Sequence, residues 1–263
     1  MQVAEINGIH LHYRRSGPSE ALAVVFSNSL GTDLRIWDDV LDHLGGGIQS
    51  LCYDKRGHGL SDAPPPPYTI DDHIGDLAGL LEHEGIRKAV ICGESVGGMI
   101  ALGLAARKPE DVRALILCDT AHKIGSDELW NERIDLIQQH GIESIADAIL
   151  ERWFSAAFRR AKQPAVAGWR NMLVRTPVDG YVGTCAAVRD ADLTLAARAL
   201  NLPVRCLAGS EDGATPPGLV QSMSDLIPES RFQVVAGAGH LPCIEAPHEI
   251  ATVIAEVIQE CAS

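Results

Sequence analysis

The chain has 263 residues, 46% of them hydrophobic, which is enough for one large domain with a sizeable core. Its 35 acidic residues against 22 lysines and arginines give a formal net charge of −13, and no basic stripe offsets it, which argues against nucleic acid and anionic membranes as partners. The longest apolar runs have about six residues, far fewer than the ~20 that span a bilayer, and the first residues do not form a secretory signal. The seven cysteines stand singly, mostly inside apolar runs, which predicts buried thiols in a soluble cytoplasmic protein rather than disulfides.

The first part of the chain alternates between strand and helix patterns. "VAEINGIHLHYRRSG" alternates around Asn7-Gly8, which predicts an antiparallel hairpin, and "ALAVVFSN" and "IQSLCYD" are apolar runs typical of strands covered on both faces. After the proline-rich "DAPPPPYT", Thr69 and Asp72 have the spacing of a helix cap, which predicts a helix through "IDDHIGDLAGLLEHEG". A strand "KAVICG", a helix "VGGMIALGLAARKP" and a strand "VRALILCD" follow.

Between Thr120 and Asp192 the pattern becomes helical throughout. Four segments have helical spacing with no strand among them: "SDELWNERIDLIQQH", "IESIADAILERWF", "PAVAGWRNMLVRT" and "DGYVGTCAAVRDAD". Strands return with "VRCLAG" and "RFQVVAG", and helices are predicted at "PGLVQSMSDLI" and "HEIATVIAEVIQEC". Because alternating strands and helices indicate a mostly parallel sheet, we predict an α/β fold with helices on both faces of that sheet. Its core domain would comprise residues 1–119 and 193–263, with a helical cap of residues 120–192 inserted between two strands.

A serine flanked by glycines directly follows the strand "KAVICG", in residues 93–97 (GESVG). This G-x-S-x-G form is either a nucleophile on a strained strand-to-helix turn or a turn that merely contains a serine. Glycines on both sides suit a sharp turn in which backbone approaches backbone. Such a turn presents the hydroxyl of Ser95 at the carboxyl end of the sheet, beside helix N–H groups that can receive a developing negative charge. The motif therefore makes Ser95 a candidate nucleophile.

A nucleophilic serine needs a base, and the base needs an acid that orients it. His240, in "GAGHLPCIEAP", follows the strand "RFQVVAG", and Asp212, in "GSEDGATPP", follows the strand "VRCLAG". Both residues are therefore predicted on loops at the carboxyl ends of strands, where Ser95 is also predicted. Asp119 is the alternative acid, because it ends the strand before the cap. His58, in "RGHG", is the alternative base, although a structural role that hydrogen-bonds its glycine-rich loop is favoured.

Essentially the whole chain resembles the α/β-hydrolase superfamily, in which a serine on such a turn precedes an aspartate and a histidine. The blocks that carry this resemblance are "DKRGHGLSD", "GESVGG", "GSEDGATPP" and "GAGHLPCIEAP". More narrowly, "FSNSLGTDLRIWDDV", "DTAHKIGSDELWNERI", "ERWF" and "NMLVRTPVDGY" resemble the 3-oxoadipate enol-lactone hydrolases of bacterial aromatic-acid degradation. Most of the superfamily has His-Gly where this chain has Asn28-Ser29, and the form Asn-Ser-Leu-Gly-Thr-Asp is typical of the enol-lactonases.

The resemblance implies a serine hydrolase that opens 3-oxoadipate enol-lactone to 3-oxoadipate through an acyl-enzyme, in the β-ketoadipate route of protocatechuate and catechol degradation. Ser95 would attack the lactone carbonyl, His240 would take the proton, and Asp212 would orient the imidazole. The backbone N–H groups of Leu30 and Val96 would form the oxyanion hole. Since the sequence has no metal-ligand motif and no dinucleotide motif, we expect neither a metal nor a cofactor.

The cap is expected to bind the small anionic lactone. Trp130, Ile134 and Ile137 share a helical face, which is either a core stripe or one wall of the pocket. An acidic protein needs a local cation to bind a carboxylate, and Arg133 is the first choice because it follows Trp130 at i+3. The further candidates from the cap are Trp153 for the pocket wall and Arg152 and Lys123 for the cation.

Three smaller predictions concern polar residues outside this set. Asp54 and Arg56 are expected to pair and so tie their loop together. Glu94 is expected to be a spacer whose side chain meets a neighbouring polar group. His73, like most of the other histidines, is expected at an edge or on a helix face in contact with solvent.

Two other functions are compatible with the sequence. Another hydrolase of the same fold, such as a carboxylesterase or a cofactor-free haloperoxidase, would differ mainly in the cap pocket. A non-enzymatic ligand-binding module on this fold comes from another class, and an intact set of Ser95, Asp212 and His240 argues against it. The sequence indicates no oligomeric state.

Overall fold

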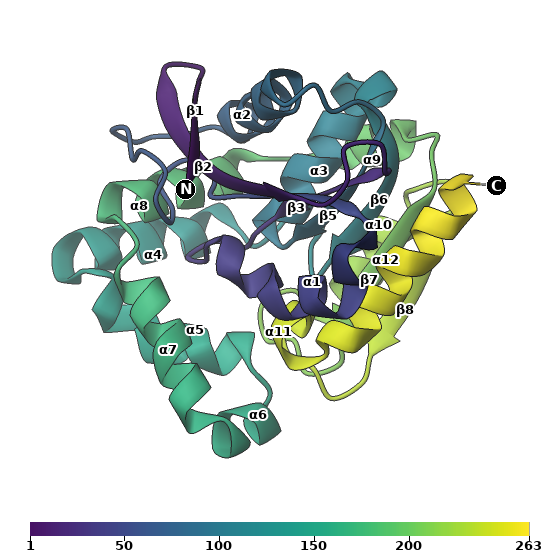
Figure 1. Cartoon of the computed structure of the whole chain (residues 1–263). Helices are drawn as coiled ribbons and strands as arrows, with labels where there is room; N and C mark the ends of the chain where they lie inside the picture. The colour runs from purple at the N-terminus through teal and green to yellow at the C-terminus, as the bar shows by residue number, and fades with distance from the viewer. Residues whose placement is uncertain (263) are drawn as a thin grey trace.

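One eight-stranded sheet runs through the computed structural model, which describes residues 1–262, in the order β1-β2-β4-β3-β5-β6-β7-β8 (Figure 1). The predicted hairpin is present, with positive φ at Asn7 and Gly8, and β2 pairs antiparallel with β4. All the other neighbouring strands are parallel. The strands are β1 (Gln2–Ile6), β2 (Ile9–Ser16), β3 (Ala23–Ser27), β4 (Gln49–Tyr53), β5 (Ala89–Glu94), β6 (Val112–Cys118), β7 (Val204–Gly209) and β8 (Arg231–Val235).

Helices cover both faces of the sheet, which confirms the predicted α/β fold class. On one face α1 (Asp38–Leu44) packs against α12 (Pro247–Ala262), and on the other α3 (Val96–Arg107) lies over β5 and β6, between α2 (Ile70–His83) and α9 (Thr194–Ala199). The predicted capping box of Thr69 and Asp72 starts α2. The remaining core helices are α10 (Pro217–Ser224), α11 (Pro242–Glu245) and the short 3-10 turns η1 (Leu34–Trp37), η2 (Gly45–Gly47) and η3 (Pro109–Asp111).

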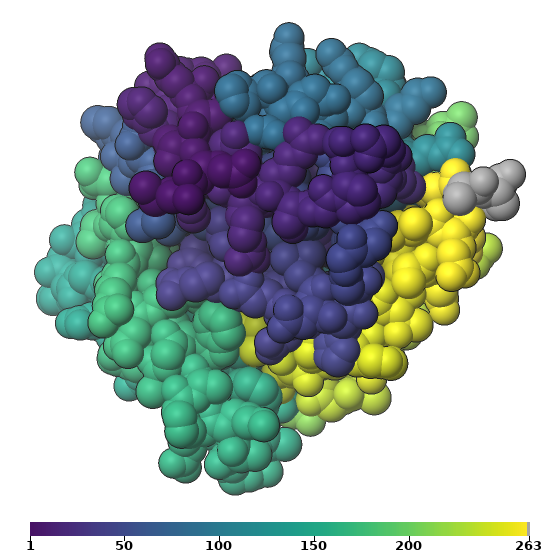
Figure 2. All heavy atoms as spheres, in the orientation of Figure 1, coloured from purple at the N-terminus to yellow at the C-terminus, as the bar shows by residue number. Residues whose placement is uncertain are grey.

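Between β6 and β7 the chain leaves the sheet and forms a helical layer. Each of the four predicted segments contains a helix, and a short α6 that the sequence did not indicate lies between two of them. Figure 2 shows the segment of α6 and α7 projecting from the body of the molecule. The division into a core of 1–119 and 193–263 and a cap of 120–192 stays a prediction, and residue 263 lies outside the described residues. The helices of this layer are α4 (Asp127–His140), η4 (Ile142–Ile145), α5 (Ala146–Trp153), α6 (Ala156–Ala161), α7 (Gln163–Val174) and α8 (Val178–Asp190).

The described residues can be compared with two predictions, one about the cysteines and one about membrane-spanning segments. All seven cysteines are free thiols, and six of them are buried as predicted, while Cys261 is partly exposed. Within residues 1–262 no helix has the length and apolar character needed to cross a membrane.

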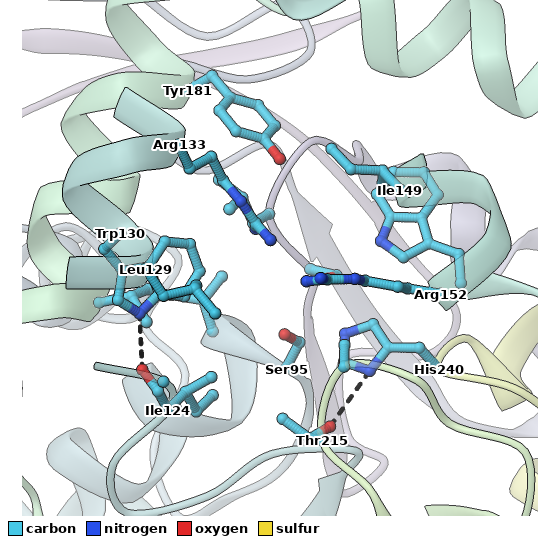
Figure 3. Close-up of a pocket in the computed structure, with 17 residues that line it drawn as sticks. Ser95, Ile124, Leu129, Trp130, Arg133, Ile149, Arg152, Tyr181, Thr215 and His240 are labelled. Atoms are coloured by element: carbon cyan, nitrogen blue, oxygen red, sulfur yellow. Dashed lines mark hydrogen bonds between the residues drawn. The ribbon is translucent and has the colours of Figure 1, made fainter. Parts of the chain in front are cut away.

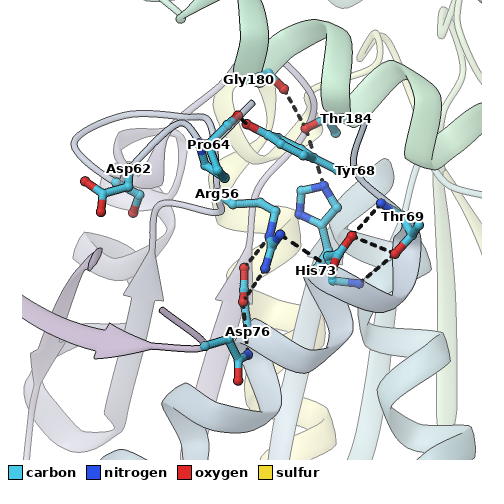
Figure 4. A network of polar contacts seen from close by, with 12 residues as sticks. Arg56, Asp62, Pro64, Tyr68, Thr69, His73, Asp76, Gly180 and Thr184 are labelled. Carbon is cyan, nitrogen blue, oxygen red and sulfur yellow. Dashed lines mark hydrogen bonds and ion pairs between the residues drawn. The ribbon is translucent and has the colours of Figure 1, made fainter. Parts of the chain in front are cut away.

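Arg56 forms buried hydrogen bonds to α2 of the core, and not to the predicted partner (Figure 4). Its guanidinium donates two hydrogen bonds, of 2.6 and 2.7 Å, to the carboxylate of Asp76 on α2. The predicted pairing with Asp54 is therefore wrong, because Asp54 instead accepts from the backbone N–H groups of Leu34 and Leu60.

His73 takes part in the same region and is buried, so its predicted position in solvent is also wrong. Burial lowers the pKa of His73 to about 3, which keeps its imidazole neutral. Its Nε2 lies 3.4 Å from Oγ1 of Thr184 on α8. The neutral ring therefore connects α2 of the core to a helix of the predicted cap.

Helix α8 also approaches the core backbone directly at Gly180. A Cβ atom built on Gly57 would lie 2.3 Å from Cα of Gly180, and one built on Gly180 would lie 2.0 Å from the carbonyl oxygen of Gly57. Gly57 in addition has a positive φ of 75°. The two backbones can come this close only because neither residue has a side chain.

Candidate active site

Ser95 occupies a sharp turn between β5 and α3. Its φ of 56° is unusual for a residue with a side chain, and α3 begins at the next residue, Val96. A Cβ on Gly93 would lie 2.4 Å from the carbonyl oxygen of Gly97, and one on Gly97 would lie 2.0 Å from the carbonyl oxygen of Ser27. The two flanking glycines therefore let the strand, the turn and the helix touch. The turn leaves the first N–H groups of α3 without partners inside the helix.

This close contact makes Gly97→Ala a sharp test of the turn. The added methyl group would meet the rigid backbone of β3, so we expect the free energy of unfolding to fall by about 1–3 kcal/mol, with a Tm lower by several degrees. Gly168→Ala on α7 is the matched control, since a Cβ there has nothing within 4 Å and alanine favours a helix. Thermal unfolding of both variants compares them, and equal melting temperatures would contradict the tight turn.

His240 and Asp212 lie on neighbouring loops beside this turn. His240 lies between β8 and α11, Asp212 follows β7, and His240 Nδ1 is 2.9 Å from Asp212 Oδ2. Both side chains are almost completely buried. Figure 3 places the imidazole of His240 next to the hydroxyl of Ser95. The structure therefore brings together the three residues that the sequence proposed as a triad.

The carboxylate of Asp212 is fixed by its own loop. Its Oδ1 accepts hydrogen bonds from the N–H groups of Ala214 (2.6 Å) and Thr215 (3.0 Å), and its Oδ2 lies 2.6 Å from the hydroxyl of Thr215. Sequence reasoning did not single out Thr215, although a threonine three residues after an aspartate in a loop is a signal for such a turn. These contacts leave Asp212 one orientation, with Oδ2 toward the imidazole of His240.

Asp119, the alternative acid, lies in the same cluster but in a different electrostatic environment. Burial, and then the charge of Asp212, raises the pKa of Asp119 well above its usual range, which favours its protonated form. Burial acts against the ionised form of Asp212 too, but the charge and hydrogen bond of His240, with the hydrogen bond of the Thr215 hydroxyl, lower its pKa below the usual range. Asp119, Asp212 and His240 hold potential ligand atoms within 4.8 Å of one another. Both oxygens of Asp212 are already occupied by Ala214, Thr215 and His240, whereas Oδ2 of Asp119 has no hydrogen-bond partner within the described residues. We therefore interpret Asp212 and His240 as a hydrogen-bonded pair rather than as metal ligands.

Leu30 and Val96 both line the pocket at Ser95, as expected of oxyanion-hole residues. His58 accepts a hydrogen bond from the loop of residues 28–32, which contains Leu30. The N–H of Gly31 donates to His58 Nε2 at 2.9 Å, and His58 Nδ1 lies 3.1 Å from the carbonyl oxygen of Arg56. His58 is fully buried and has the predicted structural role of hydrogen-bonding a loop. Burial lowers its pKa well below the usual value, so the ring is neutral with its proton on Nδ1.

The pocket over Ser95 has a wall made by helices of the predicted cap (Figure 3). Of the predicted stripe on α4, Trp130 lines the pocket, whereas Ile134 and Ile137 do not. Lys123 also lies away from the pocket lining and approaches Asp192 at 4.0 Å. The cap residues that line the pocket are Ile124, Gly125, Leu129, Trp130, Arg133, Ile149, Arg152, Trp153, Tyr181 and Val188.

Two guanidinium groups give the pocket a positive character that the whole protein lacks. Arg133 stacks on the ring of Trp130, with Cζ 4.7 Å from the ring centroid, and Arg152 extends from α5 above Ser95 (Figure 3). Within residues 1–262 neither arginine forms an ion pair with an Asp or Glu, although the net charge is −13. A ligand that carries a carboxylate could therefore serve as the acidic partner of these two arginines.

Glu94, next to Ser95, does not meet the polar neighbour that was predicted for it. The side chain is fully buried, and within the described chain neither carboxyl oxygen has a hydrogen-bond partner. Burial raises the pKa of Glu94 well above its usual range, which favours its neutral form. An ionised carboxylate in this position would repel the negative charge that develops at Ser95, so neutrality is compatible with the site.

Known proteins with this fold include several hydrolases. Residues 23–247 match a family model described as the alpha/beta hydrolase fold. The chain is 33% identical to 3-oxoadipate enol-lactonase 2 of Acinetobacter baylyi, over 91% of this chain and 89% of that protein. The crystal structure of the enol-lactonase from Burkholderia xenovorans has a TM-score of 0.95 at 35% identity, over 98% of this chain and 100% of that one. A thermophilic esterase from Thermogutta terrifontis, solved with malate bound, has a TM-score of 0.93 at 27% identity with both chains fully covered.

Proposed function

Because this chain belongs to the alpha/beta hydrolase fold family, we propose that it is a serine hydrolase that opens 3-oxoadipate enol-lactone to 3-oxoadipate. Its family and its similarity to enol-lactonases make it an ester-hydrolysing enzyme. The finer assignment, to the lactone and to bacterial aromatic-acid degradation in the cytoplasm, is our proposal. One observation carries it: a pocket joins Ser95 and His240 to two arginines for which the described part of the chain, residues 1–262, offers no acidic partner.

In the proposed reaction Ser95 Oγ attacks the lactone carbonyl carbon, and Nε2 of His240 takes the hydroxyl proton. Asp212 holds the other ring nitrogen and stabilises the imidazolium that forms. The N–H groups of Leu30 and Val96 stabilise the oxyanion of the tetrahedral intermediate.

Collapse of this intermediate breaks the ring C–O bond and leaves an acyl-enzyme on Ser95. The ring oxygen receives the proton from His240 and becomes an enol that stays attached to the acyl chain and can tautomerise to the ketone. His240 then takes a proton from water, the hydroxide attacks the acyl carbonyl, and 3-oxoadipate leaves with Ser95 regenerated. Ketonisation makes the overall hydrolysis effectively irreversible.

Turnover of the enol-lactone by the purified protein, followed by ultraviolet absorbance, tests this proposal directly. A panel of aryl esters, and of halide with peroxide, in the same buffer separates the enol-lactonase from an esterase or a haloperoxidase of the same fold. Labelling by a fluorophosphonate separates any serine hydrolase from a ligand-binding module. Rapid labelling and aryl-ester hydrolysis without lactone turnover would move the assignment to an esterase.

The cap arginines give a prediction about substrate selectivity. A bidentate bond between arginine and a partly shielded carboxylate contributes roughly 1.5–3 kcal/mol. Arg133→Ala is therefore expected to lower kcat/KM for the acidic lactone by about 10–100-fold. The methyl ester of the same lactone has no carboxylate and should be nearly indifferent to the change. Steady-state kinetics on both compounds measure the difference.

Arg170→Ala is the matched control for this experiment, because Arg170 is also a cap arginine but pairs with Asp147 at 2.9 Å outside the pocket. It should change neither activity. Arg152→Ala, measured in parallel, is the second arm, since Arg152 lines the same pocket. Equal losses on lactone and methyl ester would show that Arg133 only supports the cap, and a selective loss in Arg152→Ala alone would assign the carboxylate to Arg152.

A further inference from the structure

A buried lysine lies beneath the loop that carries the proposed oxyanion donor Leu30. Lys55 follows β4 and is only 1% exposed, so its ammonium group is inside the protein. Its Nζ donates to the carbonyl oxygen of Ser29 at 2.5 Å and lies 3.4 Å from that of Thr32. The proposed mechanism does not use this side chain. A buried amine with no catalytic contact therefore needs another explanation.

The carbonyl that Lys55 contacts belongs to the same peptide group as the N–H of Leu30. Besides Lys55, this oxygen of Ser29 accepts from the hydroxyl (2.9 Å) and the N–H (3.3 Å) of Thr32. In a planar trans peptide the C=O and the N–H point in opposite directions. With the carbonyl turned toward these three donors, the N–H of Leu30 is turned away from them. Ser29 and Leu30 line the pocket, and the described part of the chain contains no acceptor for this N–H.

We propose that Lys55 is a positioning residue that polarises the Ser29–Leu30 peptide and so strengthens the Leu30 N–H as an oxyanion donor. Hydrogen bonds that share a peptide group reinforce each other, and a bond from a charged donor is stronger than one from a neutral donor. The effect is largest when the negative charge forms, so it acts on the transition state more than on the bound substrate. This inference rests on the proposed serine mechanism but not on the identity of the lactone.

The charge on Lys55 depends on its surroundings. Burial lowers the pKa of Lys55 from 10.5 to about 7, although the charges of Asp54 and Asp33 act in the opposite direction. His58 on the same loop and His73 on α2 also face it, and both stay neutral because their own pKa values are lowered. The ammonium form of Lys55 therefore predominates below about pH 7, and the neutral amine above it.

Lys55→Met removes the donor and keeps a similar length of apolar chain. We expect kcat for p-nitrophenyl acetate to fall on the order of tenfold, less than the ~10²–10³-fold cost of removing an oxyanion donor, with KM within about twofold. Affinity for phenylboronic acid, which forms a tetrahedral adduct with the serine, should fall by the same factor. Affinity for benzoate, which forms no adduct, should stay unchanged. Arg205→Met, which removes a buried cation of β7 far from this loop, should leave all these quantities unchanged.

The pH dependence distinguishes polarisation from simple packing. Below about pH 7 the wild-type lysine is charged, so the ratio of wild-type to Lys55→Met kcat should be largest there and should decrease toward pH 9. Loss of packing alone would give a ratio that does not depend on pH. A pH-independent ratio, or equal losses of affinity for phenylboronic acid and benzoate, would overturn the role of Lys55.

A measurement on protein that retains Lys55 keeps the proposal testable if Lys55→Met does not fold. The protein used is ¹⁵N-leucine-labelled His240→Ala, which removes the histidine beside Ser95 whose own titration would also move the signal. In this protein the titration of Lys55 should shift the amide signal of Leu30 with a midpoint near pH 7. A signal that does not shift between pH 6 and 9 would contradict the proposal. Neither this experiment nor the boronate titration uses the lactone. Failure of lactone turnover would therefore affect the proposed function and leave this test intact.

Discussion

Replacing Ser95 with alanine is expected to lower kcat by at least about 10³-fold while the fold stays intact, because members of a catalytic triad act as a unit. The Ser95 hydroxyl makes no hydrogen bond that caps α3, so its removal takes away the proposed nucleophile and no structural contact of the helix. Alanine also has the same difficulty as serine in adopting a φ of 56°. The melting temperature should therefore remain close to that of the wild type.

His240→Ala should lose about as much activity as Ser95→Ala, and the double variant should lose little more than either. The measurement is kcat on the enol-lactone, or on an aryl ester if the lactone is not turned over, with circular dichroism as the control for folding. Near wild-type turnover by Ser95→Ala would rule out the serine mechanism. Losses that multiply in the double variant would mean that the two side chains act in separate steps.

The second large effect is expected from Asp212→Asn. An amide at this position selects the wrong imidazole tautomer, an effect on the order of 10⁴-fold on kcat in a serine protease. Asp119→Asn should have a small effect. Because burial favours the neutral form of Asp119, an asparagine there keeps the carbonyl oxygen that accepts from the N–H of Gly209 and removes no charge that the site needs.

Comparing kcat for the two asparagine variants decides which carboxylate orients His240. The two substitutions are matched in size and in the loss of one carboxyl group, so each serves as the control for the other. A larger loss in Asp119→Asn would move the acid to the end of β6. A large loss in both would mean that the two carboxyls share the proton on which the imidazole depends.

Much of the fold could be predicted because its elements are coded locally. The hairpin at Asn7-Gly8 and the cap of α2 at Thr69 depend on residues that are adjacent or three apart. The helices that the sequence does not indicate, α1, α6, α9 and α11, have only four to seven residues, which is too short for a helical period to stand out. Their positions depend on packing against α12, α7 and α3, which no local pattern encodes.

In the candidate site, too, the features that follow from local sequence could be predicted, and those that depend on tertiary packing could not. Ser95, Asp212 and His240 could be named because each follows a strand, and the carboxyl ends of parallel strands meet at one edge. The sequence predicts Asp54, two residues away, as the partner of Arg56, whereas the actual partner on α2, Asp76, is twenty residues away. Protonation states such as those of Asp119 and Glu94 depend on burial, which the sequence shows only as an apolar surrounding.

The glycine contact between Gly57 and Gly180 sets a rule for redesigning this enzyme. A side chain at either position would collide with the backbone of the other, so the two can be changed only together with a shift of α8. A cap transplanted from another protein must therefore bring its own glycine to this point, or it will push away the loop that carries His58. Libraries aimed at new substrates are better confined to α4 and α5, where Arg133 and Arg152 face the pocket without this constraint.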